Sequence, residues 1–557
     1  MKKIKLLGFL ILISFSISLF AEFNKDLPLT NDNYPDSFLN YKVFNAPKNT
    51  ANKVESKSIL IEVNSKVLNA KTKLWNDFFK IDKRLNVLSS FPYINIYLTL
   101  DGNDAIPENR SVRRTSHHFW DIQIGAGKAW LLDSGYTRIS LPFSFIEKNA
   151  NCVHNGVIMF DIQGNQASKA SFQIGGETCL YFKYDFLGQV DISIDSLSLD
   201  SATINEYRNW KSNQIPLKSI RSIGDRSKSF GAEKEVKPMF MSVFGYFDGE
   251  SHYRGGCSTR WGRYPYCSQM LLPSYSLSKS IYASLALDRL EDDYPGIKKA
   301  KIIDHVPECS NKKWKGVTFE HALDSAIGHY RNDKHPLDEA LISEKGFFTS
   351  LTHQEKIKLS CNLFSRKDKP GKKFVYHSTN IYVLGTAMNN YLKGVNSPSS
   401  DLYNDVMMPI WSDLNLSQAL NVVQRTADVT SQTFTAWGLF FLPSDIISIG
   451  NYLQKLAKDN PDSIMNSALQ MNKNNRGLDA FAGIKYYNNG FWARKFPGFQ
   501  VGCESDVWVP YMEGYGGIVV ALMPNGHIYY FFSDGDQFSW SKAAKASSKI
   551  KSFCGKS

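Results

Sequence analysis

A serine and a lysine three residues apart, Ser276 and Lys279, form the pattern in this chain best suited to covalent chemistry. Residues three apart on a helix share one face, so the lysine amine can lie beside the serine hydroxyl. A serine hydroxyl needs a neighbouring base to act as a nucleophile, and burial makes a lysine give up its proton more readily. The pair therefore indicates acyl transfer through Ser276. The alternative is an ordinary core helix whose lysine amine reaches solvent.

The surroundings of Ser276 distinguish it from three other Ser-x-x-Lys patterns in the chain. Pro273 precedes an apolar, alanine-containing run that ends at Pro295-Gly296, which predicts a buried helix. The other patterns stand in polar surroundings, where solvated lysines are expected, and they begin at Ser310, Ser539 and Ser548.

Residues 238–557 follow an order typical of an α+β fold with one antiparallel sheet. Two strands turning at Asp248-Gly249 begin the region, and a mostly helical middle follows. Pro524-Asn-Gly526 joins two further apolar strands, and a helical pattern over 541–550 ends the region. These elements must bring Ser276 and its partners together.

Five separated motifs within residues 238–557 are similar, in this order, to the serine β-lactamase and penicillin-binding-protein superfamily, nearest its class C-related esterases, D-aminopeptidases and oligomer hydrolases. The motifs are Ser276-Leu-Ser-Lys279, Val317-Thr-Phe-Glu-His-Ala-Leu323, Pro370-Gly-Lys-Lys-Phe-Val-Tyr376-His-Ser378, Trp437-Gly-Leu439 and Tyr515-Gly516-Gly517. The order is far more specific than any single motif. The resemblance implies a β-lactamase-like antiparallel sheet with a helical region.

The resemblance also implies a role for each matched residue. Ser276 is the nucleophile that forms an acyl-enzyme, and Lys279 and Tyr376 share the proton transfers, with the choice of base left open. The oxyanion hole is expected from the backbone N–H groups of Ser276 and Ile518. Ser378 would bind the substrate amide or orient Lys279. The substrate would lie along the strand at Tyr515, Gly516 and Gly517.

Two positions depart from the superfamily pattern. Tyr515 replaces a cationic or imidazole residue, and Ser378 replaces the asparagine common in β-lactamases. Both changes favour an esterase or amidase acting on a neutral or bulkier substrate. No motif places a glutamate to activate the deacylating water, so Tyr376 would do this or deacylation would be slow.

The first 237 residues match no family that we identify. Residues 1–21 have the basic start, apolar run and small final residue of a signal peptide, and 22–56 is predicted to be an extended segment. Short β-type runs over 57–200 predict an all-β accessory domain, sandwich-like or a barrel. A basic linker is predicted over 201–237.

Charge and cysteine content limit the compartment and the partners. Signal-peptide cleavage removes three lysines and no acid from a formal net charge of +12, and so leaves +9. An anionic envelope polymer is therefore a candidate partner, although basic charge serves solubility equally well. The sequence has no basic run interleaved with aromatic residues, the pattern that would indicate nucleic-acid binding. Neither a cofactor nor a metal is expected, no second long apolar run follows the leader, and the oligomeric state stays open.

The eight cysteines fit an oxidising compartment, periplasmic or secreted. Spacing alone does not fix their connectivity. Pairing of neighbours is favoured because each pair then stays within one region. It gives Cys152–Cys179, Cys257–Cys267, Cys309–Cys361 and Cys503–Cys554.

The leading hypothesis is an exported serine hydrolase that cleaves an ester or amide, such as a peptide-like or β-lactam-type compound. One alternative is a protein of the same fold that is acylated, or binds a ligand, without turnover. Another is an envelope-associated binding protein whose β domain carries the function.

Overall fold

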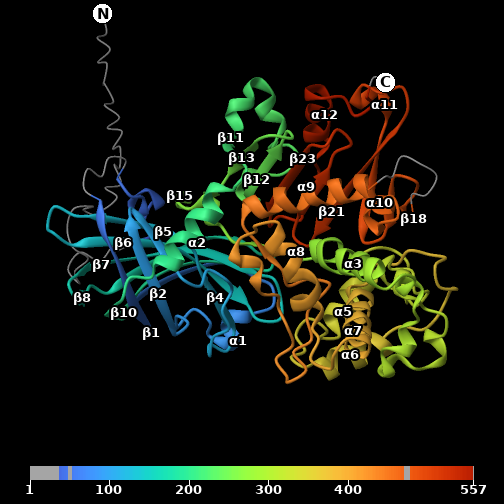
Figure 1. Ribbon diagram of the computed structural model, residues 1–557, viewed down its shortest axis with the longest axis horizontal. Helices are drawn as coiled ribbons and strands as arrows, with labels where there is room; N and C mark the ends of the chain where they lie inside the picture. The colour runs from blue at the N-terminus through green and yellow to red at the C-terminus, as the bar shows by residue number, and fades with distance from the viewer. Residues whose placement is uncertain (1–36, 48–52, 470–476, 556–557) are drawn as a thin grey trace, which may run out of the picture.

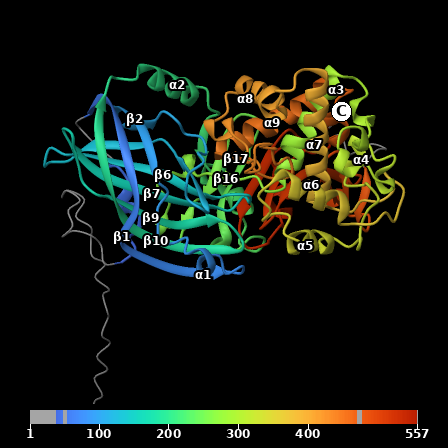
Figure 2. The same ribbon diagram turned by 90° about the horizontal axis from the view of Figure 1, so that it is seen from below.

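The computed structural model describes residues 37–47, 53–469 and 477–555. The predicted signal peptide lies outside these residues. Figures 1 and 2 show two parts side by side, a sheet built from the first 200 residues and a mixed region of helices and strands built from the rest.

The first sheet contains ten strands of the described chain, and its pairing order is β4-β6-β5-β3-β2-β1-β10-β9-β7-β8. Its strands are β1 (Val54–Asp77), β2 (Ile94–Gly102), β3 (Asp104–Pro107), β4 (Trp120–Ile124), β5 (Gly127–Leu131), β6 (Thr137–Glu147), β7 (Val153–Gln163), β8 (Gln166–Ala167), β9 (Ala170–Thr178) and β10 (Phe182–Leu197). The β-type composition predicted over 57–200 corresponds to the strands of this sheet.

The first sheet closes on itself instead of forming two separate layers. β6 pairs along its length with β7, and on its other side with β5 and then β4. The long strand β1 has three register shifts against β10, and such bulges bend and twist a strand. A sandwich-like arrangement is therefore not observed. The closed sheet encloses one apolar core, which includes Phe91, Phe143, Phe145 and Phe172.

The second sheet contains nine strands of the described chain, in the order β11-β13-β12-β23-β22-β21-β20-β19-β18. These are β11 (Leu217–Ser219), β12 (Met241–Phe247), β13 (His252–Gly256), β18 (Leu478–Phe481), β19 (Lys485–Asn488), β20 (Phe491–Phe496), β21 (Val507–Gly514), β22 (Ile518–Leu522) and β23 (Ile528–Ser533). The hairpin predicted around Asp248-Gly249 is β12–β13, and the turn at Pro524-Asn-Gly526 joins β22 to β23.

Helices cover both faces of the second sheet (Figure 1). α9 lies against β22 and β23, while α12 packs on the opposite face with an apolar cluster that includes Val519 and Phe531. A helical region lies between β13 and β18 in the sequence. The α-helices from residue 285 onwards are α3 (Leu285–Asp293), α4 (Phe319–Leu323), α5 (Leu337–Glu344), α6 (His353–Asn362), α7 (Ser378–Val395), α8 (Met408–Asp413), α9 (Pro443–Asp459), α10 (Ile464–Leu469), α11 (Gly498–Val501) and α12 (Ser541–Ile550).

Residues 201–237, predicted as a basic linker, are instead built into both parts. They form α2 (Ser201–Ser212), which lies against β2 and β3, and β11, which pairs in parallel with β13 at the edge of the second sheet. The short α1 (Ile81–Leu85) follows β1. Most charged side chains in residues 201–237 face solvent. The polar composition of this segment therefore predicted its exposure correctly, but it did not predict the helix and the strand that the segment forms.

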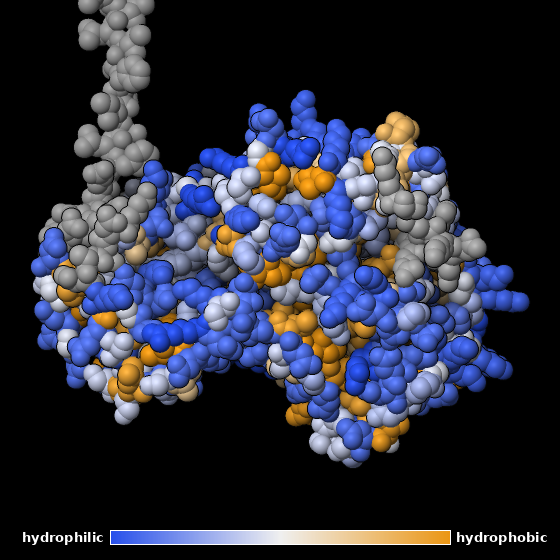
Figure 3. Space-filling model, turned by 45° about the horizontal axis from the view of Figure 1, so that its top comes forward, coloured by the Kyte–Doolittle hydropathy of each residue, from blue (hydrophilic) through white to orange (hydrophobic). Residues whose placement is uncertain are grey.

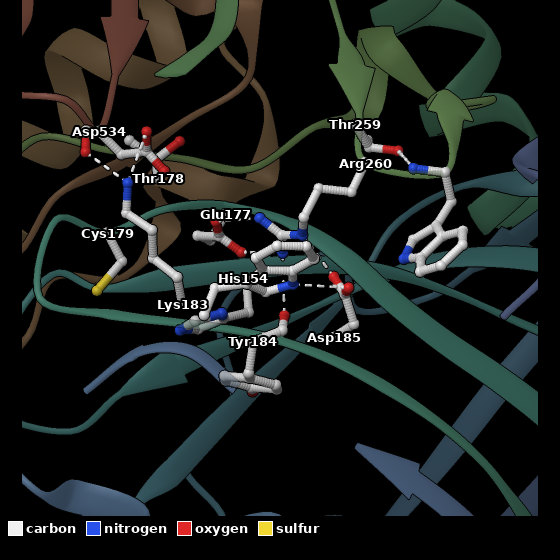
Figure 4. Close-up of polar contacts among 12 residues, drawn as sticks. His154, Glu177, Thr178, Cys179, Lys183, Tyr184, Asp185, Thr259, Arg260 and Asp534 are labelled. Carbon is white, nitrogen blue, oxygen red and sulfur yellow. Dashed lines mark hydrogen bonds and ion pairs between the residues drawn. The ribbon is translucent and has the colours of Figure 1, made fainter. Parts of the chain in front are cut away.

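The two parts share one apolar cluster and an ionic network whose acidic side chains are buried. Met159 of the first sheet belongs to the same core cluster as the helix that carries Lys279. Arg260 donates hydrogen bonds to both Glu177 and Asp185, and Lys183 pairs with Asp534 at 3.0 Å (Figure 4). These contacts fix one part against the other.

All four cysteine pairs lie at disulfide distance in the predicted neighbour pairing. Ligand atoms of Cys152, His154 and Cys179 lie within 4.8 Å of one another, but the two sulfurs bond to each other and so do not form a metal site. Among the described residues, no helix has both the length and the apolar character to cross a membrane. The face in Figure 3 is mostly hydrophilic, with scattered apolar patches.

Candidate active site

Ser276 follows a strained residue and begins an unusual helix. The two-residue strand β16 (Leu272–Pro273) pairs with β17 (Phe440–Phe441), and the chain then turns through Tyr275, whose φ is +39°. A non-glycine residue in this region stores strain that the surrounding structure must hold. A π-helix, Lys279–Ser284, leads into α3, and π-helical turns occur often at functional sites.

Lys279 is buried directly beside Ser276. Its Nζ donates to Ser276 Oγ at 2.7 Å, to Ser378 Oγ at 3.0 Å and to the Ala436 carbonyl oxygen at 3.3 Å. Only 1 % of the residue is exposed. Burial lowers the pKa of Lys279 to about 8, although the nearby Glu339 acts in the opposite direction. A neutral amine is therefore accessible at ordinary pH, which is what a general base requires.

Tyr376 lies on the other side of the lysine. Lys279 Nζ is 4.7 Å from the centroid of the Tyr376 ring, and that ring stacks on Trp492 at 5.9 Å. Burial, followed by Glu339, raises the pKa of Tyr376 well above its ordinary value, and a hydrogen bond with Ser276 opposes this shift. The phenol therefore stays protonated, and of the two predicted bases Lys279 is the better suited.

Glu339 completes this cluster, and the sequence interpretation missed it. Ser378, the first residue of α7, donates its backbone N–H to Glu339 Oε2 at 2.9 Å and its hydroxyl to Glu339 Oε1. Glu339 lies in the first turn of α5, next to Asp338, which accepts hydrogen bonds from two backbone N–H groups and from His377. The only signal in the sequence is Pro336 followed by two acids, an ordinary helix start.

The Tyr515-Gly516-Gly517 motif follows β21, which extends beyond its neighbour. β20 pairs with β21 only as far as Tyr511, so among the described residues no strand pairs with the edge from Met512 to Gly514 on that side. Gly514 packs instead against the nucleophile segment, where an added Cβ would lie 3.1 Å from the Ser274 carbonyl oxygen. The free edge of β21 therefore faces the segment that carries Ser276.

Gly516 and Gly517 serve the turn between β21 and β22. Their φ values are +86° and +101°, and a Cβ on Gly517 would lie 2.4 Å from Ser533 Oγ. The glycines are needed for this turn, and the position of a substrate along them stays a prediction. Tyr515 is 45 % exposed, and its ring centroid lies 5.7 Å from that of Tyr275.

Ile518 is not placed to supply an oxyanion-hole N–H. It is fully buried in β22, paired with Gly514 on one side and Phe532 on the other. Ser533 N donates to the Gly517 carbonyl. Because N–H groups alternate along an antiparallel strand, Ile518 must point its own N–H towards β21. Tyr515 directly follows Gly514, where the free edge of β21 ends.

Comparison with known proteins gives similarity to solved structures only. No protein-family model matches the chain, and no curated protein matches it. A chain from Bacillus anthracis, named as a candidate 6-aminohexanoate-dimer hydrolase, is 14% identical with a TM-score of 0.44. The match covers 61% of this chain and 87% of the other. A penicillin-binding protein homolog from Caulobacter crescentus is 12% identical with a TM-score of 0.41, over 60% and 98% of the two chains.

Proposed function

We propose that this chain is an exported serine hydrolase that forms an acyl-enzyme at Ser276 and cleaves an ester or amide. The observation that carries the proposal is the buried Lys279 amine, with a pKa of about 8, at 2.7 Å from Ser276 Oγ. A nucleophile and a base within hydrogen-bond reach, with the base oriented by a third group, is the general arrangement for covalent catalysis. Ser378 is that third group here.

Acylation would proceed by one proton transfer and one addition. Neutral Lys279 takes the proton from Ser276 Oγ as the oxygen attacks the substrate carbonyl carbon, giving a tetrahedral oxyanion. When the oxyanion collapses, the bond to the leaving oxygen or nitrogen breaks, and that atom receives a proton from the Lys279 ammonium, either directly or through the Tyr376 hydroxyl, which passes on its own proton as it takes that of the lysine. The neighbouring Glu339 carboxylate favours the ammonium form of Lys279 while it carries the proton.

The oxyanion would be held by backbone N–H groups of Ser276 and Tyr515. Tyr515 is proposed in place of Ile518 because it directly follows Gly514, which ends the free edge of β21 and packs against the nucleophile segment. One such donor is worth ~10²–10³ in rate. The exposed Tyr515 ring lies next to Tyr275, the residue before Ser276, and carries no cation, which supports a neutral substrate more than one recognised by its carboxylate.

A second candidate function is acylation without turnover. A water must attack the acyl-enzyme carbonyl, and a base must take its proton. Tyr376 is poorly suited to this step because its pKa is raised, and Glu339 is already bound by Ser378. Lys279 would therefore have to act twice. A burst of product without a steady state would support the acyl trap.

Export is supported by the four disulfides, which persist in oxidising compartments.

Labelling by a fluorescent fluorophosphonate, followed by intact mass, tests the nucleophile. The folded wild-type chain should gain one adduct, and Ser276→Ala should gain none. Ser539→Ala is a matched control, because Ser539 begins another Ser-x-x-Lys pattern but binds Glu235. It should label like the wild type. Short-chain esters and amides then separate turnover from a burst. An unlabelled, well-folded wild type would contradict the proposal.

A further inference from the structure

A side chain from the first sheet reaches the nucleophile segment. Asn151, fully buried in the loop between β6 and β7, accepts three hydrogen bonds on its Oδ1. The donors are the Tyr275 N–H at 3.0 Å, the Gly438 N–H at 2.7 Å and the Ser274 hydroxyl at 3.2 Å. Because two of these groups are N–H donors, the Asn151 oxygen, not its amide nitrogen, must face them.

The groups that Asn151 holds lie on both sides of the proposed site. Tyr275 is the strained residue directly before Ser276, and such a conformation persists only when its surroundings enforce it. Gly438 lies two residues after Ala436, whose carbonyl accepts a hydrogen bond from Lys279. One amide oxygen thus links the nucleophile side of the site to the chain that holds the base.

The loop that carries Asn151 is itself fixed. Cys152 is bonded to Cys179 at the end of β9. The Trp437 Nε1–H donates to the Asn149 carbonyl at 2.7 Å, and the Gln424 amide donates to the Glu147 carbonyl at 2.7 Å. The loop is therefore clamped to its own sheet by a disulfide and to the catalytic region by hydrogen bonds.

We propose that Asn151 is a positioning residue for Ser276, so that the first sheet is part of the active site and not an accessory domain. The inference rests on the proposed function, because it assumes that Ser276 is the nucleophile. It goes beyond that function by assigning a task to a region that no motif connects with the chemistry. The site is incomplete without residues 147–152.

Asn155 provides the matched control. It is also a buried asparagine of the first sheet, and it bonds the same chain segment through Leu271, accepting from its N–H at 3.0 Å and donating to its carbonyl at 3.1 Å. Loss of either asparagine leaves buried partners unpaired and lowers stability. Only Asn151 contacts Ser274 and Tyr275.

The experiment compares the fluorophosphonate labelling rate constant of the full chain for wild type, Asn151→Leu and Asn155→Leu. A small misplacement of reacting groups costs ~10²-fold in rate, so we expect that loss for Asn151→Leu. Asn155→Leu should label at about the wild-type rate, although thermal midpoints fall in both variants. Equal rates in Asn151→Leu and wild type, or equal losses in the two variants, would overturn the inference.

Asn151→Asp keeps the acceptor and serves if the leucine variant does not fold. Its carboxylate should raise the pKa of Lys279 and so move the rising limb of the pH–rate profile to higher pH. Its plateau at high pH should return close to the wild-type rate. A plateau ~10²-fold below wild type would show that the acceptor is not what matters, and would overturn the inference. A folded wild type that does not label at all would instead overturn the proposed function, and this inference with it.

Discussion

Buried charges are treated in opposite ways in the two parts of the molecule. In the first sheet, Arg138 and Asp161 are both buried and pair through hydrogen bonds of 2.8 and 3.0 Å. Lys279 is equally buried beside the second sheet, but within the described residues no carboxylate forms an ion pair with it. Its partners are two hydroxyls and a carbonyl. Each charge of the buried pair is compensated by its partner, whereas burial without an opposite charge shifts the pKa of Lys279 and makes its amine available for reaction.

A third buried cation shows that burial alone is not sufficient for chemistry. Lys356 on α6 donates to the Phe347 carbonyl at 2.6 Å and lies among the rings of Phe347, Phe434 and Trp437. Burial lowers the pKa of Lys356 to about 7. Its amine has no hydroxyl partner among its hydrogen bonds in the described chain, so it has no nucleophile to activate. The hydroxyl of Ser276 is what makes the difference.

The largest expected effect separates these two lysines. Lys279→Met should lower ester hydrolysis and fluorophosphonate labelling by ~10²–10⁴-fold, the usual contribution of a general base. Lys356→Met removes a similarly buried amine and should leave labelling unchanged. Neither variant should be strongly destabilised, because each loses the cost of burying an unpaired cation. Similar rate losses in both would mean that Lys279 acts only through the core.

The next effect concerns the paired charge in the first sheet. Arg138→Met leaves Asp161 buried without its cation, which should lower the free energy of unfolding by ~3–5 kcal/mol. The double variant with Asp161→Leu should recover most of that loss. Denaturant unfolding measures both, and the labelling rate of the folded variants should equal that of the wild type. A single variant as stable as the wild type would remove the contrast between the two regions.

A smaller effect is expected where the two parts meet. Glu147 accepts a hydrogen bond from Tyr181, and burial raises its pKa from 4.5 to about 7. Because the folded-state value is the higher one, this group stabilises the fold most below pH ~4.5, and its contribution is lost as pH rises to about 7. As the pH rises from 4 to 8, the free energy of unfolding of Glu147→Gln should therefore increase by ~2 kcal/mol relative to that of the wild type, after allowance for partial exposure. Parallel stability curves for the two chains would contradict this.

The sequence predicted which side chains come together around Ser276 better than it predicted the residues that hold them in place. The motif order identified a fold that brings four side chains together, those of Ser276, Lys279, Tyr376 and Ser378. The spacing of residues on a helix alone places Ser276 beside Lys279. Glu339 was missed because an acid in the first turn of a helix is common, and only the packing of α5 against α7 gives it a role.

The remaining errors have physical causes of the same kind. Ile518 was chosen by counting from Tyr515-Gly-Gly, but those glycines form a turn, and the free edge of β21, Met512 to Gly514, ends four residues before Ile518. Asn151 gave no signal because its partners are more than 120 residues away in the sequence. The first sheet was recognised as β from its branched residues, but its closure depends on bulges that composition does not encode.

The smallest expected effect tests how Glu339 changes the pKa of Lys279. Glu339 raises the pKa of Lys279 against the effect of burial, so removing its charge should lower that pKa below about 8. Glu339→Gln keeps one carbonyl acceptor for the Ser378 N–H, and its amide nitrogen can donate to the Ser378 hydroxyl. The labelling rate should then reach half its plateau at a lower pH than in the wild type. At pH 6.5 the variant should label a few-fold faster, because more of its lysine is neutral.

Glu344→Gln, on the same helix, is the control for a general change in charge, since the pH profile should not move when a distant acid is neutralised. Steady-state turnover of an ester should rise with labelling in Glu339→Gln, because both steps use the same neutral amine. If labelling rises but turnover falls, Glu339 itself takes the proton of the deacylating water. If labelling falls at every pH, the carboxylate orients Ser378 and Lys279, and its charge is secondary. In that case the lack of an ion-pair partner would not explain why Lys279 is reactive, although Lys279 would still differ from Arg138 in how its charge is buried.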